Sequence, residues 1–203
     1  MIRSGATGET AAELRPAAAE DVPALARALA DAFYDDPVFG WLMPDAERRL
    51  ARLRRFYVVE LRHVGLGRGQ AWTSDELAGA SISAPPGAWR VPLRAMLMQG
   101  SLFGIHVARA TRLLAAVERR HLREPHHYFP HIGVAPAAQG RGLGSRLMRP
   151  TLDRCDRDGL PAYLEASSER SAALYERLGF RLVREVRVGG SPPLRLMVRP
   201  AAA

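Results

Sequence analysis

Apolar residues return every three or four positions after Asp21, which predicts an amphipathic helix ending near Phe33. The residue before a proline avoids the helical region, so Asp36-Pro37 and Pro44 mark breaks in the chain. Two further helices are predicted next to these breaks, at 39–42 and 45–64. The first third of the chain is therefore expected to be mainly helical, preceded by a short strand at 14–16.

Shorter apolar runs bounded by turn residues predict strands in the middle of the chain. Segments 70–73 and 78–84 have the pattern of a strand pair around the turn Ser74-Asp75-Glu76. Residues 89–120 are predicted to be helical in two pieces, with a hinge around Gly100–Gly104.

The second half of the chain alternates between strand and helix patterns. Helices are predicted at 141–158 and 169–178, and Gly179 stands where a left-handed cap would end the second one. Strands are predicted at 126–134, 162–165, 180–188 and 194–198. Such alternation is typical of an α/β fold, in which helices cover a mixed sheet. We expect residues 1–12, which are small and polar, to be flexible, and 13–200 to form a single domain.

Composition and charge narrow the class of protein. Of the 203 residues, 47% are apolar and 25% charged, the balance of a soluble globular protein. The net charge is +8, but the basic residues, all arginine, alternate with acidic ones, which argues against a nucleic-acid-binding face. Cys155 is the single cysteine, and no apolar run reaches the length of a membrane span. We therefore expect a soluble, cytoplasmic protein without a nucleic-acid or membrane partner.

A glycine-rich segment follows the predicted strand that ends at Val134. Gln139-Gly-Arg-Gly-Leu-Gly-Ser145 begins a predicted helix, whose first turn has free backbone N–H groups and a partial positive charge. Glycines at 140, 142 and 144 would let a diphosphate approach those groups without a Cβ in the way. The spacing matches neither a Walker loop nor a dinucleotide fingerprint. An anion site and a purely structural turn are the two interpretations.

A second pattern lies on the next strand–helix unit. Ser171 and Tyr175 are four residues apart, so they share one helix face with Leu174 and Leu178, and this face should be turned toward the sheet. A tyrosine in this place is either a core residue or a catalytic one. Two such sites on consecutive strand–helix units are expected to meet at one edge of the sheet.

Together these motifs resemble the GNAT superfamily of N-acetyltransferases, and within it the puromycin N-acetyltransferase type. Gln139-x-x-Gly142-x-Gly144 is similar to the coenzyme motif of the superfamily, and 164–180 to its tyrosine-bearing segment. Phe33–Pro37, Glu124-Pro125 and 159–162 have the puromycin acetyltransferase-like form. The resemblance extends over about 14–200.

The resemblance implies a GNAT fold, with a mostly antiparallel central sheet splayed between its fourth and fifth strands and helices on both faces. Acetyl-CoA would be the co-substrate, with its pantetheine arm between those strands. Tyr175 would be the general acid for the leaving thiolate, since a phenol stays protonated at pH 7. The implied coenzyme-binding residues are Ile132, Gly133, Val134, Gln139, Gly140, Arg141, Gly142, Leu143, Gly144, Ser145, Ser171 and Tyr175. Many relatives have asparagine where Ser171 stands, and serine would make a weaker or water-bridged contact.

The general base is less defined by the sequence. Glu165, at the end of a predicted strand beside the gap, is our first candidate and would act through water. Asp35, Asp36 and Glu60 are alternatives if the N-terminal helices cover the acceptor pocket. His126, His127 and His131 match no usual metal-ligand spacing, so no metal is predicted.

The function predicted from the sequence is acetyl transfer from acetyl-CoA to a primary amine of a small molecule, in detoxification or resistance. One alternative is a protein N-terminus or lysine as acceptor. Another is a non-catalytic domain that senses acyl-CoA. The protein is expected to be a monomer or a homodimer.

Overall fold

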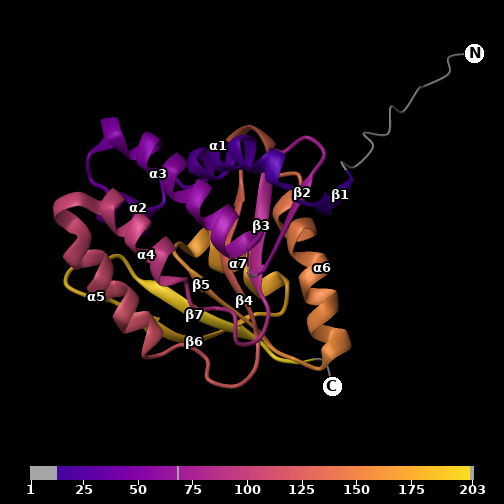
Figure 1. Ribbon diagram of the computed structural model, residues 1–203. Helices are drawn as coiled ribbons and strands as arrows, with labels where there is room; N and C mark the ends of the chain where they lie inside the picture. Colours follow the sequence, from indigo (N-terminus) through magenta and orange to yellow (C-terminus); the bar gives the residue numbers. More distant parts are fainter. Residues whose placement is uncertain (1–12, 68, 202–203) are drawn as a thin grey trace, which may run out of the picture.

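The computed structural model describes residues 13–67 and 69–201, and a sheet of seven strands forms its centre (Figure 1). The strand order is β1-β2-β3-β4-β5-β7-β6, and only β4 and β5 pair in parallel. This confirms the predicted mixed sheet; residues 1–12, predicted to be flexible, lie outside the described residues. The strands are β1 (Leu14–Pro16), β2 (Gln70–Ser74), β3 (Gly79–Ala84), β4 (His127–Val134), β5 (Ala162–Ala166), β6 (Arg181–Val186) and β7 (Leu194–Arg199).

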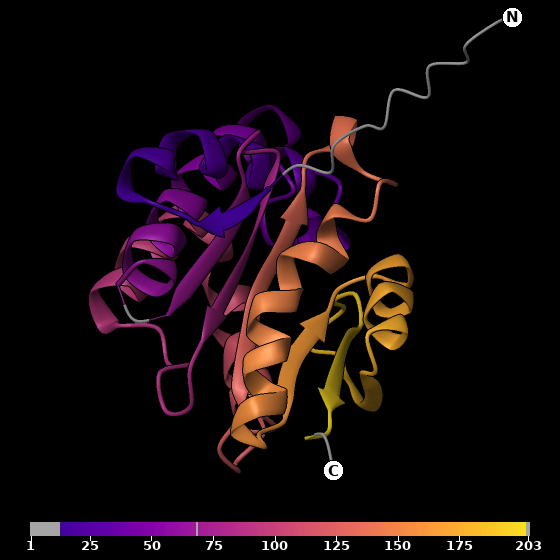
Figure 2. The ribbon, with the colours of Figure 1, turned by 90° about the vertical axis from the view of Figure 1, so that its right-hand side faces the viewer.

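Helices cover both faces of the sheet, as Figure 2 shows. On one face the N-terminal helices pack on residues such as Ala80 and Ile82 of β3. On the other face the two C-terminal helices pack on Phe129 and Leu164. The first group is α1 (Val22–Ala32), α2 (Pro37–Leu42), α3 (Ala46–Glu60), α4 (Leu93–Gly100) and α5 (Val107–Glu118), and the second is α6 (Leu143–Asp158) and α7 (Glu169–Arg177). Four short helical turns complete the fold, at Ala19–Asp21, Leu61–Gly65, Ser101–His106 and Pro136–Ala138.

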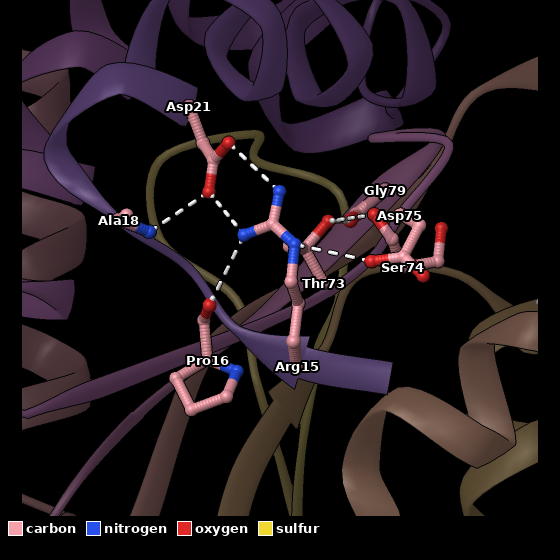
Figure 3. Close-up of polar contacts among 8 residues, drawn as sticks. All are labelled: Arg15, Pro16, Ala18, Asp21, Thr73, Ser74, Asp75 and Gly79. Atoms are coloured by element: carbon pink, nitrogen blue, oxygen red, sulfur yellow. Dashed lines mark hydrogen bonds and ion pairs between the residues drawn. The ribbon is translucent and has the colours of Figure 1, made fainter. Parts of the chain in front are cut away.

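The edge strand β1 is held in place by Arg15 (Figure 3). Its guanidinium donates to both carboxylate oxygens of Asp21, at 2.6 and 2.9 Å, and to Asp75 in the β2–β3 turn at 3.2 Å. These hydrogen bonds hold the pKa of Asp21 below its usual value. Because Asp21 directly precedes α1, the same contacts fix where α1 begins over the sheet.

Strands β4 and β5 separate soon after they pair. Their register runs only from His127↔Ala162 to Phe129↔Leu164, whereas β4 continues to Val134. The last two residues of β5 pair with β7 on the other side. The predicted splay between the fourth and fifth strands is therefore present, and it opens beyond Phe129 and Leu164.

A β-bulge in β4 changes which face its side chains reach. Ile82 of β3 pairs with His131, but Ala84 pairs with Tyr128, so β4 has one residue more than β3 in this stretch. Pro130 lies inside the bulge, where a missing N–H is tolerated. Phe129 packs under α6 and α7, whereas His131, two residues later, packs among the aromatic rings of α1 to α3. The bulge thus turns His131 toward the N-terminal helices.

Most predicted elements are confirmed, although several begin or end a few residues from the predicted position. The helix predicted at 45–64 ends at Glu60 and is continued by a π-helical turn. The helix predicted from Arg141 begins at Leu143. The strand predicted at 180–188 spans Arg181–Val186; it is the last strand of the sheet, and Leu182 on it is 54% exposed. The hinge at Gly104 is confirmed, since its φ of 54° and ψ of −129° are not helical. Among the described residues, no helix is apolar and long enough for a membrane span.

Candidate active site

The loop between β4 and α6 exposes main-chain N–H groups at the start of a helix. Within the described chain, the amides of Leu143, Gly144 and Ser145 donate to no backbone carbonyl. They form the first turn of α6, where helical amides lack an internal partner. This turn therefore concentrates three donors and the positive end of the helix dipole at one place.

The glycines before this turn keep its approach open. Gly140 and Gly142 have φ of 81° and 75°, a left-handed backbone that glycine adopts at no steric cost. A Cβ at either position would meet nothing within 4 Å. Arg141 lies exposed between them. Gln139 ties the loop to the strand, because its Nε2 donates to the carbonyl of Val134 at 2.9 Å.

The backbone of β4 presents alternate polar groups to the gap between β4 and β5. Ala135 donates to the carbonyl of Ala78 in the extension of β3, so the hydrogen-bonded register places Gly133 opposite Ala80. Antiparallel pairing alternates, so the N–H and C=O groups of Ile132 and Val134 point away from β3, on the side of the gap, where the Val134 carbonyl accepts from Gln139. Those of Gly133 are used in the sheet.

Gly133 has a different reason to be glycine. A Cβ at this position would lie 2.8 Å from both Leu29 Cδ2 and Phe33 Cε2 of the segment that packs over it. Gly133 therefore also has a structural role, because the missing side chain lets α1 pack closely on β4 where this strand borders the gap.

Tyr175 is buried on α7, 6% exposed, with its ring 6.0 Å from that of Phe180. Burial, with a smaller contribution from the carboxylate of Asp36, raises the pKa of the phenol. Tyr175 comes from the face of α6 and α7, whereas Asp36 comes from the opposite face. The charge of Asp36 thus reaches Tyr175 although the two residues come from opposite faces of the sheet.

The same opening is bridged by a hydrogen bond from Ser167 to Asp36. Ser167 follows β5, and Asp36 is the N-cap of α2, accepting from the amides of Val38 and Phe39 at 2.9 and 3.0 Å. Burial raises the pKa of Asp36 above its usual value. Of the predicted base candidates, Asp36 is therefore at the gap, whereas Asp35 is exposed.

Ser171 is occupied by a capping interaction that the sequence analysis missed. Its hydroxyl lies 3.0 Å from that of Ser168 and donates to the Ser168 carbonyl at 2.9 Å, and the Ser168 amide donates to it at 3.2 Å. The sequence could have predicted this cap, because Ser168 and Ser171 have the three-residue spacing of a capping box.

Glu165 belongs to a buried polar cluster on the face of the N-terminal helices. Its Oε2 accepts from the Tyr128 hydroxyl at 2.8 Å, and its Oε1 lies 3.7 Å from Nδ1 of His121. His121 in turn contacts His126, Nε2 to Nε2 at 3.0 Å, and stacks on Trp89. Glu165 Oε1 and the hydroxyl of Tyr163 have no hydrogen-bond partner among the described residues.

A second buried carboxylate, Glu60, lies on the inward face of α3. Gln99 of α4 donates to its Oε1 at 2.5 Å, and His131 Nε2 is 3.9 Å from its Oε2. Burial raises the pKa of Glu60 to about 7, against the effect of the Gln99 hydrogen bond, and lowers the pKa of His131 to about 3. The sequence shows this feature as an acidic residue at a core-facing position, three residues after Tyr57.

A family model described as the Acetyltransferase (GNAT) family matches residues 26–180. The chain belongs to the GNAT family. An uncharacterized N-acetyltransferase of Schizosaccharomyces pombe is 28% identical to this GNAT protein over 202 residues, 89% of this chain and 80% of that protein. The N-alpha-acetyltransferase RimI of Mycobacterium tuberculosis is 43% identical over 84 residues, 38% of this chain and 52% of RimI.

Solved structures agree with the family. The crystal structure of histone acetyltransferase HPA2 and related acetyltransferase from Corynebacterium glutamicum superposes with a TM-score of 0.72 at 25% identity, over 95% of this chain and 97% of that one. This GNAT protein is therefore an acetyltransferase, and GNAT enzymes use acetyl-CoA as acetyl donor.

The buried Glu60 predicts a pH dependence of stability in this GNAT protein. The folded state holds the carboxyl proton more tightly than the unfolded state, with a pKa of about 7 against 4.5. The free energy of unfolding should therefore fall by roughly 3 kcal/mol as the pH rises through this range. In Glu60→Gln this fall should be absent. Chemical denaturation below and above the range measures both proteins, and parallel pH dependences would refute the prediction.

Proposed function

We propose that the protein transfers the acetyl group of acetyl-CoA to a primary amine of a small molecule. The observation that supports this best is the opening between β4 and β5. The first-turn amides of α6, the outward backbone groups of Ile132 and Val134, and Tyr175 all border it. The likeness to puromycin N-acetyltransferase belongs to this proposal. So do the single catalytic domain at 13–200 and a cytoplasmic setting.

The residues present fit a diphosphate at the start of α6. Three first-turn amides lack backbone acceptors among the described residues, and the surface over Gly140 and Gly142 is open. In this proposal Leu143, Gly144 and Ser145 hold the diphosphate by their amides, with Arg141 adding positive charge beside it. Gln139 keeps the loop against β4.

The pantetheine arm runs along β4 in this proposal. Its amides pair with the backbone groups of Ile132 and Val134, and Gly133 contributes by letting α1 pack closely behind the strand. Ser171 takes part only if its hydroxyl turns from Ser168 toward the arm. The thioester then lies near the separation point of the two strands, where backbone N–H groups stabilise the developing oxyanion.

Tyr175 is the general acid of this mechanism. The amine attacks the thioester carbon, the C–N bond forms and the C–S bond breaks, and the phenol gives its proton to the leaving sulfur. The raised pKa keeps this proton in place at neutral pH until a thiolate forms. The opposite task is to remove a proton from the incoming ammonium. Both oxygens of Asp36 already accept hydrogen bonds, whereas Glu165 and Glu60 each keep one oxygen without a partner among the described residues and are the candidates.

Thiol release from acetyl-CoA tests the proposal. The panel consists of puromycin, 2-phenylethylamine, putrescine and a peptide with a free N-terminus. We expect CoA formation with at least one of the small amines, and the acetylated amine in the mass spectrum. Tight binding of acetyl-CoA without transfer to any member would contradict the proposal and favour a sensing role.

The second candidate function is acetylation of protein N-termini. It is favoured by the similarity to RimI, which is named an N-alpha-acetyltransferase, over 84 residues. Transfer to the peptide and to none of the small amines would decide for it.

A further inference from the structure

Two buried polar atoms without partners lie together on α3, beside the gap. Tyr57 is 0% exposed and Glu60 3% exposed. Neither the Tyr57 hydroxyl nor Glu60 Oε2 has a hydrogen-bond partner among the described residues. Buried polar groups in folded proteins are almost always paired, so two unpaired ones side by side indicate a place for a polar ligand.

The surroundings of Glu60 hold one of its oxygens and leave the other available. Gln99 fixes Oε1 at 2.5 Å. Among the described residues, the nearest basic group to Oε2 is His131, at 3.9 Å, and it stays neutral because burial lowers its pKa to about 3. The charge of Glu60 also acts on two tyrosines, Tyr57 of the same helix and Tyr128 of β4. Glu60 is thus a carboxylate prepared for a cation that the described residues do not supply.

This place is connected to the proposed general acid. Burial raises the pKa of Tyr57, and the charges of Asp36, Glu60 and Tyr175 add to this rise. The Tyr57 ring lies 5.2 Å from that of His131 and 5.5 Å from that of Phe33, which covers Gly133. The Tyr57 hydroxyl therefore lies within electrostatic range of Tyr175, Asp36 and Glu60.

We propose that Glu60 binds the ammonium group of the acceptor and takes its proton before the amine attacks the thioester. This inference rests on the proposed function and assigns its base. The ammonium gives one proton to the Glu60 carboxylate, which passes it to solvent. After attack, the nitrogen loses its second proton as the C–S bond breaks. That proton restores the Tyr175 phenol, which has protonated the thiolate.

The geometry favours Glu60 over Glu165 for this step. Each carboxylate keeps one oxygen without a hydrogen-bond partner in the described part of the chain, Oε2 in Glu60 and Oε1 in Glu165, so their surroundings make the difference. Glu165 accepts from Tyr128 and lies against His121, in a polar cluster that extends toward His126. Glu60 lies beside His131 and the aromatic rings that surround it, and the face of an aromatic ring attracts a cation. A base that titrates near neutral pH is also efficient there, and burial raises the pKa of Glu60 to about 7. The aromatic rings that surround His131 are Phe33, Phe39, Phe56 and Tyr57.

The substitution Glu60→Gln tests the assignment. Glu47→Gln is the control, because it is the same substitution at an exposed position of α3. At neutral pH we expect kcat/KM of Glu60→Gln to fall at least about 100-fold, within the usual contribution of a general base. The rise of kcat/KM through about pH 7 in the wild type should be absent from Glu60→Gln and retained in Glu47→Gln. Both variants should bind coenzyme A as the wild type does. A Glu60→Gln enzyme with the wild-type rise would overturn the inference.

A titration separates this inference from the proposed function. Carbon NMR of labelled glutamate side chains follows Glu60, assigned by its absence from Glu60→Gln. Adding 2-phenylethylamine to the protein with coenzyme A should lower the midpoint of Glu60, because a bound ammonium favours the carboxylate. If an amine that the wild type acetylates leaves the titration midpoint of Glu60 unchanged, the inference is refuted and the proposed function is not. No acetylation of any amine would refute the proposed function, whatever Glu60 does.

Discussion

Replacing Tyr175 with phenylalanine should lower kcat by at least about 100-fold, within the usual contribution of a general acid. The affinity for coenzyme A should change by less than about fivefold, the effect of one neutral hydrogen bond. The reason is that the leaving thiolate would depart without a proton, while the contacts of the coenzyme remain. Steady-state rates and calorimetric titrations with coenzyme A measure the two quantities.

Tyr34→Phe is the matched control for this substitution. It removes a hydroxyl that donates to the Ala46 carbonyl at 3.2 Å, on the exposed side of the N-terminal helices. We expect its kcat to stay near the wild-type value. A Tyr175→Phe enzyme with the wild-type rate at every pH would exclude Tyr175 as the acid.

Replacing Gly142 with glutamate should abolish coenzyme binding and leave the fold intact. The new carboxylate would stand before the first turn of α6, where it repels a diphosphate and competes for the same amides. The fold should tolerate it, because a Cβ at this position meets nothing within 4 Å. The left-handed backbone at φ of 75° adds a strain of about 1–2 kcal/mol. Circular dichroism and the heat of coenzyme A binding measure the two effects.

Sequence patterns predicted the parts of the fold that depend on local chemistry. Gly179 after α7 adopts the left-handed conformation that its position indicated. The space over Gly140 and Gly142 is open, as expected for glycines that leave room beside the first turn of α6. The alternation of strand and helix patterns predicted the sheet and its helical cover, since an element that buries one face repeats its apolar residues with the spacing of a strand or of a helix.

The parts that were missed depend on tertiary contacts. The bulge at Pro130 turns His131 to the other face of the sheet, and nothing in the alternation of β4 predicts this change. Glu60 was one of several acidic candidates until packing buried it between Gln99 and His131. Ser171 was expected at the coenzyme, but a local capping partner was available three residues earlier.

Calorimetric titration of coenzyme A into Gly142→Glu and Gly159→Glu tests the site at α6 most directly. Gly159 lies at the opposite end of the same helix, has φ of 63°, and is equally open around a Cβ. The two variants therefore share the substitution and the backbone strain and differ in which helix end receives the charge. The account predicts no detectable binding to Gly142→Glu and wild-type affinity for Gly159→Glu. Wild-type affinity in Gly142→Glu, or an equal loss in both, would contradict it.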